Sequence, residues 1–206
     1  MTEWQPPDTQ RPAQNRVDDR SNGWEAVASQ LLALRSNIGR ATIRDWIATL
    51  PRRGAVLDLG CGGGVPVSEA LLEAGFDVYG IDAAPSLVAA FNRRFPSSHV
   101  ACEPVEDSRF FDRSFDAAVA VGLVFLLPEE SQRALIRRVA AALNPQGRFL
   151  FSAPVETGSW TDIMTGGPSL SLGDDAYKAV LADAGLSLVG EYVDEGESHY
   201  YDVSKV

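Results

Sequence analysis

The stretch from residue 55 to residue 64 limits the fold of this chain more than any other. It reads Ala-Val-Leu-Asp-Leu-Gly-Cys-Gly-Gly-Gly. Apolar residues around a single carboxylate, Asp58, followed by glycines, are typical of a short buried strand that ends in a tight turn. The next residues, 66–74, have helical spacing and end at Gly75. A strand, a glycine turn and a helix in this order are how an α/β sheet brings its backbone against a nucleotide-like ligand.

The spacing of the glycines distinguishes two kinds of ligand. The dinucleotide fingerprint G-x-G-x-x-G, begun at Gly60, requires a glycine at position 65, where this chain has Val65. The pattern present is Asp-x-Gly-x-Gly-x-Gly, with glycines at positions 60, 62 and 64. This pattern resembles motif I of the class I S-adenosylmethionine (SAM)-dependent methyltransferases. A nicotinamide oxidoreductase is therefore disfavoured, and an ordinary glycine turn is the remaining alternative.

Strands and helices alternate along the rest of the chain. Further strands are predicted at 77–81, 98–102, 115–121, 148–152, 186–193 and 198–204. Helices are predicted at about 24–35, 40–50, 66–75, 85–95, 128–143 and 173–184. This alternation predicts an α/β fold with a doubly wound, mostly parallel seven-stranded sheet and helices on both faces. The resemblance implies the strand order 3-2-1-4-5-7-6, with strand 7 antiparallel.

The chain is predicted to form a single methyltransferase domain over residues 21–206, and its 206 residues suffice for a substantial core. Its N-terminal helices, within 21–50, are expected to cover the site. Residues 1–20 are polar, rich in proline and without periodicity, which predicts a flexible tail. The stretch 153–172 is long for a loop in a compact domain and is therefore expected to be functional.

The charge disfavours nucleic acid as a partner. The chain carries 18 Lys and Arg against 28 Asp and Glu, a net charge of −10, which would repel a phosphate backbone. The basic pairs Arg93-Arg94 and Arg137-Arg138 are each interpreted as part of a solvated helix face. A small-molecule methyl acceptor is expected instead.

The composition also gives expectations about the cellular compartment and the oligomeric state. No run of about 18 apolar residues is present, so no membrane span is expected. The N-terminus lacks a secretory signal pattern, which predicts a cytoplasmic protein. The two cysteines, Cys61 and Cys102, are too few for a disulfide scaffold or a structural zinc site. A monomer and a homodimer both remain open.

The predicted topology places a cofactor site. Ligands of open parallel sheets bind outside the carboxyl ends of the strands, where the strand order reverses. In the predicted order this point lies between the strands at 55–59 and 115–121. The strand at 77–81 ends in Asp82, whose two carboxylate oxygens can accept hydrogen bonds from both ribose hydroxyls. An N-cap of the helix at 85–95 is the alternative role for this acid.

The resemblance extends beyond the glycines. The stretch 103–116 is similar to the family's segment beside adenine, but it has Pro104 where an acid or asparagine is common. The resemblance implies that Asp58 orders the glycine turn, and that backbone carbonyls at 121–123 accept from the SAM ammonium group. The cofactor-binding residues it implies are Asp58, Gly60, Cys61, Gly62, Asp82, Ala83, Leu87, Val105, Glu106, Val121 and Gly122.

The chemistry requires few side chains. Methyl transfer from a sulfonium is an in-line displacement in which positioning can supply much of the acceleration. The strands that end at Val121-Gly122 and Ser152-Ala153 have no acids there, so no metal is expected. His199 begins the last strand, on the cofactor side, and is a candidate general base, with an ordinary sheet histidine as the alternative.

Aromatic residues are candidates for contact with the substrate. Core packing is the alternative for each of them. They are Trp24, Trp160, Tyr200 and Tyr201. The predicted function is transfer of the methyl group of SAM to a small-molecule acceptor without metal, which leaves S-adenosylhomocysteine (SAH). An RNA or protein methyltransferase, and a SAM-binding module without transferase activity, are the alternatives.

Overall fold

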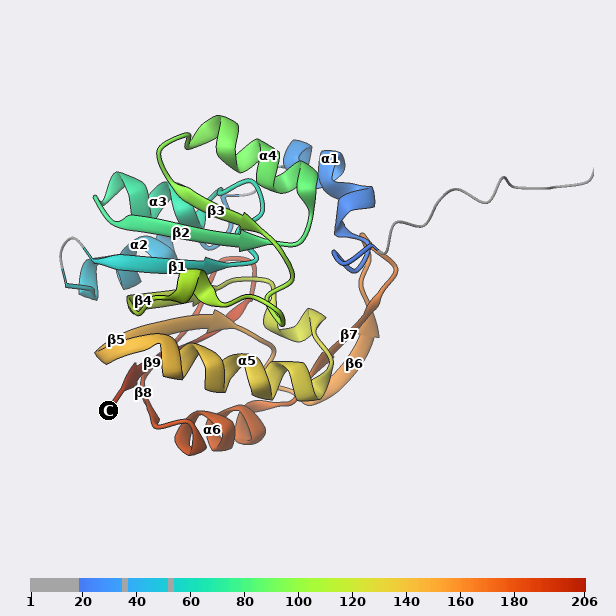
Figure 1. The fold of residues 1–206 in the computed structure, drawn as a ribbon. Coiled ribbons are helices and arrows are strands. Elements are labelled where there is room, and N and C mark those ends of the chain that lie inside the picture. Colours follow the sequence, from blue (N-terminus) through green and yellow to red (C-terminus); the bar gives the residue numbers. More distant parts are fainter. Residues whose placement is uncertain (1–18, 35–36, 52–53) are drawn as a thin grey trace, which may run out of the picture.

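The computed structural model describes residues 19–34, 37–51 and 54–206 and contains one seven-stranded sheet (Figure 1). Its strands are β1 (Ala55–Leu59), β2 (Asp77–Asp82), β3 (His99–Cys102), β4 (Phe115–Ala120), β5 (Leu143–Ser152), β8 (Leu186–Val193) and β9 (His199–Lys205). They lie in the order β3-β2-β1-β4-β5-β9-β8. The first five pair in parallel, and β9 pairs antiparallel with both neighbours. This confirms the predicted α/β fold and strand order.

Six helices in the described part of the chain lie close to their predicted ranges. They are α1 (Trp24–Leu34), α2 (Arg40–Thr49), α3 (Val67–Glu73), α4 (Pro85–Arg94), α5 (Glu129–Ala142) and α6 (Asp174–Asp183), with short 3-10 turns η1 (Phe110–Asp112) and η2 (Val124–Leu126). Helices α5 and α6 cover one face of the sheet, α2, α3 and α4 cover the other, and α1 packs on α4 (Figure 1). Of the predicted tail, residues 1–18 lie outside the described residues.

The central strand β1 shows how the sequence specifies a sheet that is covered on both faces. All five of its residues are buried. Leu57 and Leu59 pack in the cluster beneath α5 and α6, whereas Val56 packs in the cluster beneath α2 and α3. A parallel strand that is covered on both faces must be apolar on both faces, which accounts for the continuous Ala-Val-Leu run. No helix in the described part of the chain is long and apolar enough to cross a membrane.

The stretch 153–172 differs from the prediction of a loop. It contains a separate antiparallel hairpin, β6 (Gly158–Thr161) and β7 (Pro168–Ser171). Both strands have only four residues, and the first, Gly-Ser-Trp-Thr, lacks the alternation of apolar and polar residues by which a strand is recognised. The side chain of Gln132, on α5, attaches the hairpin by donating to the Leu170 carbonyl at 3.0 Å and to the Leu127 carbonyl at 2.9 Å. A contact with a distant helix therefore holds this hairpin.

A buried carboxylate joins α2 to the antiparallel side of the sheet. Asp202, on β9, is fully buried. It accepts hydrogen bonds from Trp46 Nε1 on α2 at 3.1 Å and from Tyr192 Oη on β8 at 3.1 Å. Arg148, on β5, donates Nε to the same carboxylate at 3.0 Å and forms an ion pair with it. A buried charge is tolerated only when it is paired in this way.

We expect Asp202→Ala to destabilise the fold strongly. The Arg148 side chain is 15% exposed and would lose its carboxylate partner. Removing one partner of a buried ion pair costs about 3–5 kcal/mol in free energy of unfolding, measured by urea titration. Asp45→Ala, which removes an exposed acid from α2, is the control and should stay within about 0.5 kcal/mol of the parent. Equal stabilities of the two variants would contradict the role of this cluster.

Candidate active site

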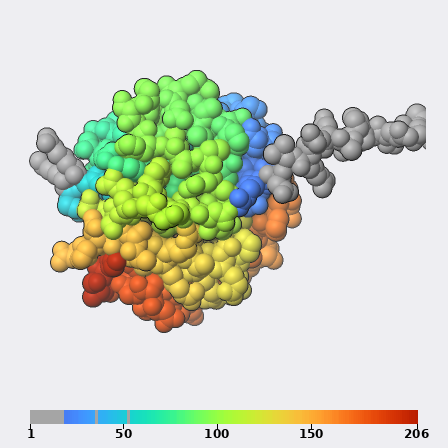
Figure 2. Space-filling model, in the orientation of Figure 1, coloured from blue at the N-terminus to red at the C-terminus, as the bar shows by residue number. Residues whose placement is uncertain are grey.

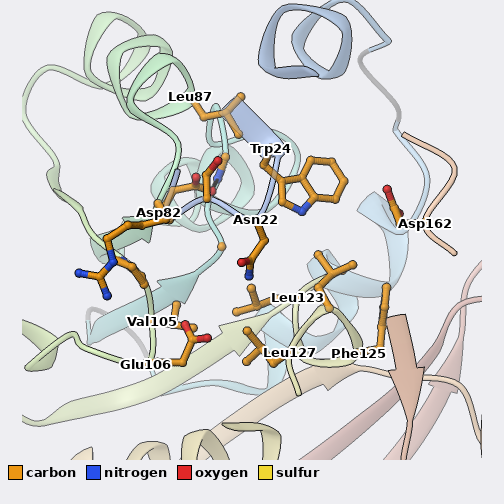
Figure 3. A pocket seen from close by; sticks show the side chains of 18 of the residues that line it. Asn22, Trp24, Asp82, Leu87, Val105, Glu106, Leu123, Phe125, Leu127 and Asp162 are labelled. Atoms are coloured by element: carbon orange, nitrogen blue, oxygen red, sulfur yellow. Dashed lines mark hydrogen bonds between the residues drawn. The ribbon is translucent and has the colours of Figure 1, made fainter. Parts of the chain in front are cut away.

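A cavity of about 370 Å³ lies at the carboxyl ends of β1, β2 and β4. The sheet order reverses there, and the volume is in the range of cofactor and small-molecule sites. The predicted cofactor residues that line it are Gly60, Gly62, Asp82, Ala83, Leu87, Val105, Glu106, Val121 and Gly122. In Figure 3, Asp82, Val105 and Glu106 lie on the left of the cavity, Phe125 and Asp162 on the right, and Asn22 between them.

Two glycines of the turn after β1 are required for different reasons. Gly62 has φ 53°, and a Cβ added there would meet no protein atom within 4 Å, so its backbone is open to a ligand. Gly64 has φ 82°, and a Cβ there would lie 2.4 Å from Cε2 of Phe95. The first glycine leaves room for a ligand, and the second lets the turn pack against α4.

Asp82 connects the glycine turn to the end of β2. Its Oδ2 accepts from the backbone N–H of Gly62 at 2.9 Å, and its Oδ1 accepts from that of Ala84 at 2.8 Å. Burial raises the pKa of Asp82, and these two hydrogen bonds partly offset that rise. Each carboxylate oxygen has two lone-pair sites, so each can accept one further hydrogen bond.

The alternative role of Asp82 as a helix cap does not match this geometry. The N-cap residue of α4 is Ala84, and no side chain bonds to the helix from that position. Glu25, on α1, instead accepts from the Ser86 backbone N–H at 2.9 Å and from its hydroxyl. The first turn of α4 is therefore stabilised by a carboxylate from another helix.

Asp58 and Cys61 are not among the residues that line the cavity. Asp58 is buried and accepts from the Ser68 hydroxyl. Burial raises its pKa to about 7, and the nearby charge of Asp82 adds to the rise while the Ser68 hydrogen bond opposes it. Cys61 packs against Gly80, and burial raises the pKa of its thiol. These two side chains support the glycine turn from behind.

The segment before α1 forms part of the cavity wall. The Ser21 hydroxyl accepts from the Glu25 backbone N–H at 2.8 Å and thereby caps the first turn of α1. Trp24 and Asn22 both line the cavity. Asn22 was not predicted as a site residue, although the Asn-Gly pair at 22–23 signals a turn. Its φ of 54° is left-handed, a conformation that asparagine tolerates better than most residues.

The loop after β3 is held by an arginine that we expected to be solvated. Arg138, on α5, donates to the carbonyls of Val105 and Glu106 at 2.8 Å each, and also to the Ser108 carbonyl. The interpretation of Arg138 as part of a solvated helix face is therefore wrong. A guanidinium has five donors in a fixed plane, which suits it to bind several carbonyls of one loop.

Tyr200 and Tyr201 belong to the core. Their exposed fractions are 1% and 0%. Tyr200 donates its hydroxyl to Asp194 Oδ2 at 2.8 Å, and the Tyr201 ring stacks on Phe151 with centroids 4.9 Å apart. The expectation that these tyrosines contact the substrate is therefore wrong, because alternate residues of β9 point to opposite faces of the sheet, both covered by helices.

His199 and Trp160 also lie outside the cavity wall. The His199 ring nitrogen Nε2 is 3.2 Å from Glu191 Oε1 on β8, and the ring meets that of Tyr201 edge-on. The Trp160 ring lies 5.6 Å, between centroids, from that of Phe125, which does line the cavity. Trp160 thus supports the wall from outside, and His199 faces α6 and β8.

The end of β4 carries no acid. The Ser152 hydroxyl, at the end of β5, instead accepts from the Gly122 backbone N–H at 2.8 Å. Among the described residues, no group of three or more His, Cys, Asp and Glu side chains could hold a metal ion.

Comparisons with known proteins agree with this geometry. The family described as a methyltransferase domain matches residues 56–147, which include the glycine turn and most of the cavity residues. YqeM of Bacillus subtilis, a protein named only as a methyltransferase, is 35% identical over 112 residues, 52% of this chain and 45% of the relative. A glycine/sarcosine N-methyltransferase of Halorhodospira halochloris is 29% identical over 164 residues, 75% of this chain and 58% of the relative. The chain thus spans about half the length of these curated relatives.

A solved structure extends the likeness to the whole fold. The 1,6-didemethyltoxoflavin-N1-methyltransferase of Burkholderia thailandensis superposes with a TM-score of 0.69 and 19% identity, covering 90% of both chains. Fold, glycine turn and matched family agree. Residues 56–147 are thus similar to a methyltransferase domain, and the fold around them is that of solved methyltransferases.

Proposed function

We propose that this chain transfers the methyl group of SAM to a small-molecule acceptor by in-line displacement, which leaves SAH. This proposal rests on one observation. The Gly62 backbone, which has free space in front of it, and the Asp82 carboxylate line the same cavity and are hydrogen-bonded to each other. A ribose presents two hydroxyl donors, and Asp82 has an unused acceptor site on each oxygen. The residues present therefore fit the adenosine half of SAM.

The charge of the cavity supports the same cofactor. SAM carries positive charge on its sulfonium and its ammonium group. The charged side chains in the described wall are Arg20, Asp82, Glu106 and Asp162. Three of the four are acids, and the Arg20 guanidinium already pairs with Asp107. An electrostatic field of this sign favours a cationic ligand.

The contribution of the chain to the reaction is mainly positioning. Bound SAM would supply the methyl group, and the cavity would hold the acceptor in line with it. Trp24, Leu123 and Phe125 form an apolar wall that excludes water from the acceptor (Figure 3). His199 is not in this wall, so we propose no base role for it.

Two relatives support a small acceptor rather than a macromolecule. One is named for glycine and sarcosine, and the other for 1,6-didemethyltoxoflavin. The net charge of −10 disfavours RNA. A SAM-binding module without transferase activity is the second candidate, and the apolar wall beside the cofactor residues, which would contact an acceptor, disfavours it. The cytoplasmic setting and the monomeric or homodimeric state stay predictions of the sequence.

SAM and SAH should bind with micromolar affinity, whereas NAD and NADP should not bind measurably. The glycine spacing and the position of Asp82 fit the cofactor of methyl transfer, and Val65 breaks the dinucleotide fingerprint. Calorimetric titration of the purified chain with each ligand tests this expectation. Tighter binding of NAD than of SAM would refute the proposed cofactor.

Asp82→Ala should weaken SAH binding about ten- to a hundred-fold, because hydrogen bonds to a charged group contribute about 1.5–3 kcal/mol each. Asp82→Asn should also bind poorly, since an amide offers one acceptor oxygen in place of two. It should melt nearer the parent, because that oxygen can keep one of the bonds from Gly62 and Ala84.

Asp77→Asn is the matched control for Asp82, because Asp77 lies at the exposed start of the same strand. It should leave SAH binding unchanged in calorimetry. If Asp82→Asn binds SAH like the parent and Asp82→Ala only lowers the melting temperature, the carboxylate serves the glycine turn alone. The ribose would then be bound elsewhere.

Methyl transfer should survive treatment with EDTA. The ends of β4 and β5 are joined by the neutral hydrogen bond between Gly122 and Ser152, with no acid at either end. The assay compares transfer from labelled SAM before EDTA, after EDTA, and after magnesium is added back. Activity that is lost and then restored by magnesium would show that the reaction uses a metal ion.

A further inference from the structure

The side of the cavity away from Asp82 has a chemistry of its own. Three residues from separate elements line it: Trp24 at the start of α1, Phe125 of η2, and Asp162 directly after β6 (Figure 3). The hairpin and the N-terminal segment lie side by side there: a Cβ added at Gly23 would be 3.5 Å from Thr165 Cβ. In the space-filling view, the blue N-terminal residues lie beside the orange hairpin at the right edge (Figure 2).

The Asp162 carboxylate is held rigidly by its own turn. Its Oδ1 accepts from the backbone N–H groups of Met164 at 3.0 Å and Thr165 at 2.7 Å, and from the Thr165 hydroxyl at 2.8 Å. The Asp162 backbone N–H donates to the Gly167 carbonyl at 2.8 Å. No described residue donates to Oδ2. One oxygen is thus used by the turn, and the other is free in a fixed place.

The aromatic rings near Asp162 are also supported. Trp160 packs against Phe125, and Trp24 begins a helix that Glu25 fastens to α4. The faces of aromatic rings carry negative charge and attract cations, as a carboxylate does. Trp24, Phe125 and Asp162 together are therefore complementary to a positively charged nitrogen on an apolar group. An anionic acceptor would meet only acids, apart from the paired Arg20.

We infer that the methyl acceptor is an amine carried on an apolar or aromatic group, and that Asp162 Oδ2 binds its nitrogen. This inference rests on the proposed function and names the substrate class for the same site. The bound ammonium first releases one proton to water, because only the neutral amine has a lone pair.

The charge balance of the transfer gives Asp162 its role. The nitrogen lone pair forms the new N–C bond while the bond between methyl and sulfur breaks, and that electron pair stays on sulfur. Positive charge therefore moves from sulfur to nitrogen, and the product is a methylated ammonium beside a neutral thioether. A carboxylate fixed beside the nitrogen stabilises the charge that arrives there. Asp162 is thus an electrostatic group and need not remove a proton.

Binding of small probes tests this inference. We would saturate the chain with SAH and titrate it calorimetrically with phenylalkylamines of increasing length, each paired with the alcohol and the carboxylate of equal length. The best amine should bind at least about ten-fold more tightly than its two partners, a difference of about 1.4 kcal/mol. The same amines should be methylated by labelled SAM, as detected by mass spectrometry.

Variants then assign the preference to Asp162. Asp162→Asn keeps an oxygen for the turn but loses the charge, so amine affinity should fall about ten-fold, with alcohol affinity and SAH affinity unchanged. Glu156→Gln removes the same charge from an exposed position just before β6 and should change none of these affinities. Asp162→Lys should transfer the preference to the carboxylate probes.

Several results would overturn the inference. One is a panel in which no amine binds more tightly than its alcohol. Another is that Asp162→Asn weakens SAH binding as much as it weakens amine binding. Asp162 would then belong to the cofactor half of the cavity. If SAH does not bind the parent chain, the proposed function fails, and the inference that rests on it fails as well. Normal SAH binding with no preference for amines rejects the inference alone.

Discussion

The two hydrogen bonds accepted by Asp82 are the interaction on which the rest of the site depends. They join the end of β2 to the glycine turn after β1 and to the N-cap residue of α4. A charged acceptor binds backbone N–H groups more strongly than a neutral one does. These bonds therefore offset part of the free-energy cost of burying the carboxylate. They fix the backbone of Gly62, which faces the open cavity. The carboxylate therefore shapes the cofactor site whether or not a ligand is bound.

The other walls of the cavity are held by polar side chains that reach across from neighbouring elements. Glu25 fastens α1 to the first turn of α4, Arg138 binds three carbonyls of the loop after β3, and Gln132 attaches the β6–β7 hairpin to α5. These side chains bond backbone groups at the start of a helix, in a loop and in a hairpin strand, respectively. The sheet and its helices thus form a rigid base, and these attachments position the segments from which we infer acceptor specificity.

Local patterns predicted most of the fold. The apolar run of β1, the glycines after it and the helical spacing of 66–74 are signals contained within about twenty neighbouring residues. The same is true of the position of Asp82 at a strand end. Because parallel strands end at one edge of a sheet, the predicted strand order was enough to bring the cofactor candidates to one place. Nine of them line the cavity, while Asp58 and Cys61 lie behind it.

The sequence by itself determined the order of the elements, the glycine turn and the acid at the end of β2, since each follows from the periodicity or conformational preference of adjacent residues. Only the tertiary structure decided which aromatic residues are exposed to a ligand. Tyr200 and Tyr201 entered the core because helices cover both faces of β9. Asp162, Asn22 and Phe125 reached the cavity because contacts between segments distant in the chain place them there, and no local pattern records such contacts.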